Sequence, residues 1–78
     1  MKNTLWHLPP GGRGRINELR LSGAMARRLT ELGFMEGETA RKLLQNRSMA
    51  AYLIQGTVIA LRRGDAMKII AEEVAEWD

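Results

Sequence analysis

The 78-residue chain has no cysteine, a single histidine and only two Trp, one Tyr and one Phe. The absence of cysteine excludes a disulfide bond, a thiolate metal site and a cysteine nucleophile. It also suits the reducing cytoplasm, which is where we expect this protein to act. The small number of aromatic side chains leaves few of the stacking platforms that single-strand nucleic-acid binders use.

Long apolar runs are absent as well. No run approaches the ~20 residues that a membrane-spanning helix needs. Lys2 is not followed by a long apolar segment, so we expect neither a signal peptide nor direct membrane insertion. A hydrophobic content of 45% nevertheless favours a folded chain, and its length suits one domain with one core.

The charged residues are divided unevenly along the chain. Residues 1–71 hold all 12 Lys and Arg but only five acids, whereas residues 72–78 hold four acids and no base. These parts carry +7 and −4, which sum to the formal net charge of +3. We therefore divide the chain into a basic domain of residues 1–71 and an acidic C-terminal tail of residues 72–78. Such a domain could bind an acidic partner, contact its own tail, or simply present a solvated surface.

A short amphipathic helix is predicted from Ser22 to Leu32. Met25, Leu29 and Leu32 recur at i, i+4 and i+7, which places them on one helical face. The Ser22 hydroxyl is expected to cap the first turn by accepting from an unpaired amide. Gly33 is expected to end the helix in a left-handed conformation, which glycine adopts without steric cost.

The remaining apolar pattern indicates short strands separated by turns. The spacing between Ile16 and Leu19 changes parity, which predicts a bulge in the first full strand. We expect five strands, at residues 13–21, 38–45, 50–55, 57–62 and 68–71. The fold class is therefore mainly β: a small, strongly bent sheet closed into a barrel of about five strands, with the helix plugging or flanking one open end. The predicted core includes Leu29, Leu32, Phe34, Ile54, Ile59 and Leu61, with Met25 and Met67 as filling.

Two segments carry a more specific signature, Arg28-Leu29 through Leu32-Gly33-Phe34 to Gly37, and Gly56 with Ile59-Ala60-Leu61-Arg62. Their order and spacing resemble the FeoA family, the small cytoplasmic component of bacterial ferrous iron transport. The resemblance covers roughly residues 5–71. It implies an SH3-like β-barrel with an inserted helix, and contact with the cytoplasmic part of the FeoB membrane permease.

Catalytic chemistry is not expected from these residues. Ser22 and Ser48 have no histidine base nearby in the sequence. The segment Gly11-Gly12-Arg13-Gly14 lacks the Gly-Lys-Ser/Thr ending of a phosphate-binding loop, and a tight turn explains it better. We therefore predict a protein that is not an enzyme and has no cofactor.

A metal site within one chain is not expected either. His7 is the only histidine, and the adjacent Glu72 and Glu73 point to opposite faces of a strand or lie about 100° apart on a helix. Ferrous iron is usually held by several nitrogen and oxygen ligands, which one histidine cannot supply. A metal shared between subunits through His7 or the tail acids stays open.

Binding to a protein partner is the leading prediction. We expect an apolar groove near the inserted helix, rimmed by basic side chains. Methionine suits adaptable contacts, and Tyr and Arg are enriched at interface hot spots. The candidate contact residues are Arg27, Met35, Arg47, Met49 and Tyr52. An exposed strand edge, or Trp77 in the tail, could also support a homodimer.

Two alternatives remain. A pI near 10 is compatible with a small nucleic-acid-binding barrel, but the basic residues are dispersed and the aromatic residues are widely separated. A stand-alone regulatory SH3-like domain, similar to that of metal-dependent repressors, would instead bind a proline-containing segment.

Overall fold

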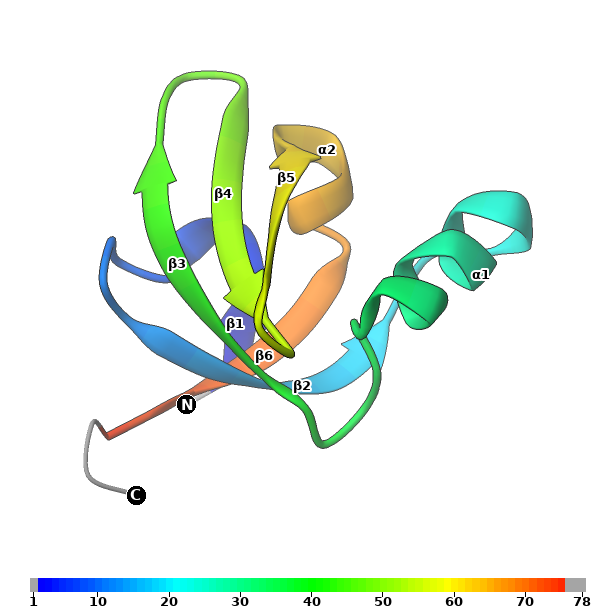
Figure 1. Ribbon diagram of the computed structural model, residues 1–78, viewed down its shortest axis with the longest axis horizontal. Coiled ribbons are helices and arrows are strands. Elements are labelled where there is room, and N and C mark those ends of the chain that lie inside the picture. The colour runs from blue at the N-terminus through cyan, green and yellow to red at the C-terminus, as the bar shows by residue number, and fades with distance from the viewer. Residues whose placement is uncertain (1, 76–78) are drawn as a thin grey trace.

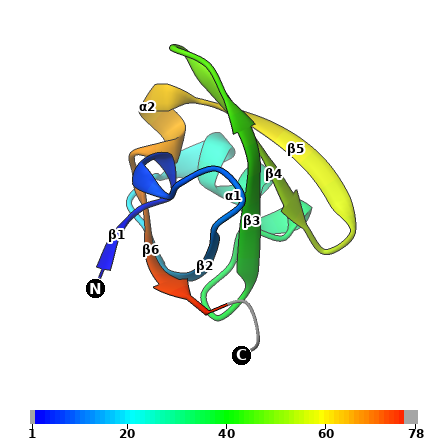
Figure 2. The same ribbon diagram turned by 90° about the vertical axis from the view of Figure 1, so that its left-hand side faces the viewer.

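Six strands form one antiparallel, strongly curved sheet in the computed structural model, which describes residues 2–75 (Figures 1 and 2). The strand order is β1-β6-β2-β3-β4-β5. The strands are β1 (Lys2–Thr4), β2 (Arg13–Leu19), β3 (Thr39–Gln45), β4 (Met49–Ile54), β5 (Thr57–Arg62) and β6 (Ile69–Val74). The helices are the 3-10 helix η1 (Leu5–His7), α1 (Gly23–Leu32) and α2 (Arg63–Ala66).

The mainly β fold with one main helix is confirmed, but the sheet is not closed. β1 and β5 stand at the two ends of the strand order and do not pair with each other. β1 leads directly into η1 and β5 leads directly into α2, so both end strands turn into helices that contact one another. The predicted closed barrel is therefore open at the level of hydrogen bonding.

The strand count is six rather than about five because β1 joins the sheet by pairing alone. Its residues are polar and carry no strand pattern, yet they pair with β6 from Lys2 opposite Glu72 to Thr4 opposite Ile70. β6 is also longer than predicted and runs to Val74, so Glu72 and Glu73 are strand residues. Trp77 lies outside the described residues.

The predicted bulge in β2 is confirmed. The pairing of β2 with β6 shifts between Ile16 and Glu18, which leaves Asn17 as the extra residue. The same part of β2 also binds the segment that follows α1. The Ile16 amide donates to Glu38 O at 2.8 Å, and the Gly37 amide donates to Ile16 O at 2.8 Å.

Helix α1 ends as predicted. Gly33 has a φ of 113° and its amide donates to the Leu29 and Thr30 carbonyls, while the Phe34 amide donates to Leu29 O at 2.9 Å. The bonds from Phe34 to Leu29 and from Gly33 to Thr30 form the Schellman motif. The capping role of Ser22 was wrong: it occupies the N-cap position, but its hydroxyl makes no capping bond. Gly23 after it has a φ of 68°, so the first helical residue lacks the right-handed geometry that such a cap requires.

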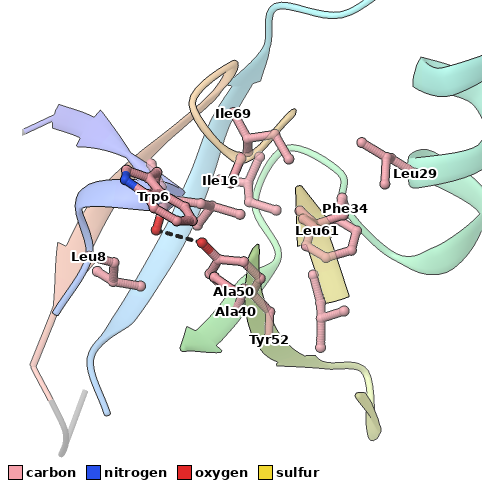
Figure 3. Packing of buried hydrophobic residues seen from close by; sticks show 14 residues of the cluster. Trp6, Leu8, Ile16, Leu29, Phe34, Ala40, Ala50, Tyr52, Leu61 and Ile69 are labelled. Atoms are coloured by element: carbon pink, nitrogen blue, oxygen red, sulfur yellow. Dashed lines mark hydrogen bonds between the residues drawn. The ribbon is translucent and has the colours of Figure 1, made fainter. Parts of the chain in front are cut away.

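The core lies between the curved sheet and the helical segments (Figure 3). Burial of Leu29, Phe34, Ile54 and Leu61 is confirmed, and Ile59 is partly buried against them. Leu5 is buried as well. Trp6 and Tyr52 are also buried, though they were not among the predicted core residues.

Three predictions of burial were wrong: Met25, Leu32 and Met67 are 41%, 36% and 39% exposed. Leu29 is the one buried residue of α1. Because the helix is fixed to the core at this single point, Met25 and Leu32 project one turn beyond the core on either side.

Candidate partner-binding site

A groove runs between α1 and β5, with a volume of about 210 Å³. Most of its lining side chains are apolar, and two are arginines. The lining residues are Met25, Arg28, Leu29 and Leu32 from α1, Met49 from β4, Ile59, Ala60, Leu61 and Arg62 from β5, and Asp65 from α2.

The sequence builds this groove from two different periods. On α1, Met25, Leu29 and Leu32 share one face because they are four and three residues apart. On β5, Ile59 and Leu61 alternate toward the core side of the sheet. Figure 3 shows the Leu29 side chain pointing from α1 toward the buried cluster, which includes Leu61.

The charge at the groove is predominantly positive. Arg28 on α1 and Arg62 at the end of β5 are both exposed. Asp65 at α2 is partly buried and is the one acid that lines the groove. Two cations against one carboxylate favour an anionic group on a ligand that enters here.

The structure separates the predicted contact residues. Only Met49 lines the groove, while Met35 lies in a second hollow between α1 and the end of β2. Arg27 lies on an outer surface of α1 together with Thr30. Arg47 lies in the β3–β4 loop beside a further hollow.

Tyr52 requires a correction, because it is fully buried and cannot contact a partner from the surface. Its hydroxyl donates to Leu5 O at 2.8 Å, which ties β4 to η1. Burial raises the pKa of the Tyr52 phenol, because the neutral form is favoured away from water. The residue is therefore structural. The sequence of β4 could have indicated its burial, because Tyr52 lies two residues from Ala50 and from Ile54 and shares their buried face.

The burial of Lys42, which lies next to Tyr52, was not predicted from the sequence. Lys42 is fully buried, and its ammonium donates to Trp6 O at 2.5 Å and to Gln45 Oε1. The Nζ atom also lies 5.3 Å from the centroid of the Trp6 ring and 5.8 Å from that of Tyr52. Its charge is met by carbonyl groups and ring faces, and burial lowers the pKa of Lys42.

Neither a metal centre nor a membrane span is found in the described part of the chain. Within residues 2–75, no three or more His, Cys, Asp or Glu side chains are grouped so as to hold a metal ion. The imidazole Nδ1 of His7 instead lies 2.7 Å from the Thr4 hydroxyl. No helix in the same range is long and apolar enough to cross a membrane.

The curved six-stranded sheet with a helix inserted between β2 and β3 defines a small SH3-like protein, with a groove beside that helix. The FeoA domain model matches residues 3–73. The chain therefore belongs to the FeoA family, which is associated with ferrous iron transport.

Solved structures agree with this assignment. FeoA of Stenotrophomonas maltophilia, described as a prokaryotic SH3 domain protein and solved with zinc, is 29% identical with a TM-score of 0.77, covering 88% of each chain. Iron(II) transport protein A of Clostridium thermocellum is 30% identical with a TM-score of 0.85, covering 91% of this chain and 45% of that one. A manganese-dependent transcriptional repressor shares the fold, with a TM-score of 0.82 and 20% identity. That match covers 94% of this chain and 41% of the repressor chain. No curated protein matched the chain.

Proposed function

We propose that this protein is a non-enzymatic accessory protein of bacterial ferrous iron uptake. It acts in the cytoplasm by binding the cytoplasmic part of the FeoB permease, and the α1–β5 groove is the contact surface. The observation that carries the proposal is the group of partly exposed apolar side chains, Met25, Leu32 and Met49, that share this groove. Clustered exposed apolar surface is a general mark of an interaction site.

The character of the lining supports a protein partner. Met25 and Met49 have flexible thioether side chains that adapt to different neighbours. Arg28 and Arg62 flank them, and arginine is enriched at interface hot spots. Membership of a family associated with ferrous iron transport supports the permease of that system as the partner.

Three residues outside the groove remain candidates for a wider interface. Met35 and Arg27 lie on other sides of α1, and Arg47 lies in the β3–β4 loop. The exposed apolar surface could also join two copies of the chain. Sedimentation velocity of the free protein distinguishes a monomer from this homodimer.

Calorimetric titration with the cytoplasmic region of FeoB from the same organism tests the proposal. We expect Leu32→Glu and Met49→Glu to weaken binding by at least about tenfold, or ~1.4 kcal/mol, because each places a carboxylate in an apolar contact. Leu44→Glu is the matched control, since Leu44 is 62% exposed and lies on β3 outside the groove. Absence of binding by the unmodified protein, or equal losses in all three variants, would refute the proposal.

A further inference from the structure

β5 is an edge strand whose outer side has no partner strand. It stands at the end of the strand order and pairs with β4 alone within the described residues. The turn before it contains only Gln55 and Gly56, with φ of 48° and 76°, which is the type I′ geometry of a two-residue hairpin. In such a hairpin the residues that flank the turn, Ile54 and Thr57, exchange hydrogen bonds.

The regular register then decides which backbone groups face outward. Because bonded and non-bonded pairs alternate, Thr57, Ile59 and Leu61 bond to β4. Val58 and Ala60 therefore direct their N–H and C=O groups away from β4, along the free edge. Natural sheets usually blunt such an edge with a bulge, a lysine or a proline. β5 pairs with β4 without a register shift and has none of these between residues 57 and 61.

The free edge borders the α1–β5 groove. Ile59 to Arg62 form one wall of the groove, and Met25, Leu29 and Leu32 of α1 form the other. Its volume of about 210 Å³ is below the roughly 300–1,000 Å³ typical of small-molecule sites. The groove therefore suits a few side chains of an extended segment better than a whole small ligand.

We propose that an extended acidic segment of a protein partner adds to β5 as a further strand and lies in the groove beside α1. Its backbone hydrogen-bonds to Val58 and Ala60, and its apolar side chains pack against Met25 and Leu32. Its carboxylates lie near Arg28 and Arg62. The site stands on this geometry, and only the identification of the segment with FeoB rests on the proposed function.

A second copy of the chain fits the same edge less well. Its own β5 carries Arg62, followed by Arg63, and would bring no carboxylate to the Arg28 and Arg62 already present. There is no acid between residues 57 and 63 to offset these charges. Like charges across an interface suppress association, so charge complementarity selects an acidic segment.

A synthetic peptide of alternating valine and glutamate with blocked termini tests the site, and a valine–lysine peptide is the control. Amide hydrogen exchange of the full chain is measured by NMR with and without each peptide. We expect the glutamate peptide to slow exchange at Val58 and Ala60. The Ile59 and Leu61 amides serve as internal references, because β4 already protects them in the free protein.

Charge variants provide the second readout. Arg28→Glu and Arg62→Glu are each expected to weaken binding of the glutamate peptide by at least about tenfold. Arg20→Glu is the matched control, since Arg20 lies outside the groove and loses only an exposed ion pair with Glu18. The inference is overturned if the glutamate peptide does not bind, or binds without protecting Val58 and Ala60. It is also overturned if these amides are already protected in a dimer of the free protein.

The two proposals fail separately. If the cytoplasmic region of FeoB binds but leaves Val58 and Ala60 unprotected, strand addition is wrong and the accessory function stands. If the glutamate peptide binds as expected but the FeoB region does not, the strand site stands and FeoB is the wrong partner.

Discussion

The Tyr52 hydroxyl donates a hydrogen bond of 2.8 Å to the backbone carbonyl of Leu5, a residue 47 positions earlier in the chain (Figure 3). This bond joins the middle of β4 to η1, in a region where both residues are fully buried. Phe34 meets the Tyr52 ring edge-on, with centroids 6.4 Å apart. The phenol therefore connects the N-terminal segment to the core on which the groove is built.

Replacing Tyr52 by Phe should destabilise the protein by about 1–3 kcal/mol, because the buried Leu5 carbonyl loses its donor. Urea unfolding followed by circular dichroism measures the change. Thr30→Val is the control, since its hydroxyl donates to Ala26 O at an exposed site and should matter little. Equal losses in the two variants would show that burial does not govern the Tyr52 bond.

Lys42 should respond differently to two substitutions. Lys42→Ala should cost roughly 2–5 kcal/mol, because it removes a buried side chain and leaves Trp6 O and Gln45 without a donor. Lys42→Met fills the space without a charge that must be desolvated but leaves the same acceptors without a donor, so it should cost less than Lys42→Ala without being neutral. A methionine variant as unstable as the alanine variant would show that the ammonium contacts, and not the packing, dominate.

The lowered pKa of Lys42 also predicts a pH dependence. Between that lowered pKa and the ordinary value of 10.5, the unfolded chain binds more protons than the folded chain. Stability of the unmodified protein relative to Lys42→Met should therefore rise as pH increases through this window. Urea titrations of both proteins at a series of pH values measure the difference, and the Tyr52 contribution cancels because both contain it. A constant difference would contradict the shift.

Gly33→Val should lower stability by about 1–3 kcal/mol or more, because a φ of 113° is strained for any residue with a Cβ. An added Cβ would also lie 3.0 Å from Gln55 Oε1. Gly64→Ala is the contrasting glycine, since its Cβ would meet nothing within 4 Å and alanine favours the helix α2. Thermal melting compares the two, and similar melting temperatures would remove the structural requirement at Gly33.

Leu29→Ala should destabilise the protein by roughly 2–5 kcal/mol and should loosen α1, because Leu29 is the one buried residue of that helix. Leu32→Ala makes the same chemical change on the same face at a position that is 36% exposed, so its cost should be smaller. Denaturant unfolding gives the two free energies, and hydrogen exchange reports the helix directly. If α1 amides exchange no faster in Leu29→Ala, another contact holds the helix.

Local signals predicted most elements because each depends on neighbouring residues. The spacing of Met25, Leu29 and Leu32 placed a helix, Gly33 placed its end, and the parity change after Ile16 placed a bulge. β1 could not be found this way, because Lys2 to Thr4 become a strand only through pairing with β6.

The candidate site was predicted in kind and only partly in detail. A groove beside the inserted helix follows from an apolar helical face next to an apolar strand. Which side chains line it depends on how closely the helix packs against the sheet. Met25 and Leu32 were predicted to lie in the core, but they are exposed and line the groove. The sequence could not show that Met35 and Met49 line different hollows, one on each side of α1.

The sequence by itself determined the mainly β fold, the inserted helix and its glycine end, because these follow from local periodicity and backbone preference. Its signature segments pointed to the family by resemblance. Only the tertiary structure decided that Tyr52 is a core residue, that Lys42 is buried on carbonyl groups, and that β5 is a free edge beside α1. These properties depend on contacts between residues far apart in the chain. A one-dimensional pattern specifies which face a side chain takes, but not what that face meets.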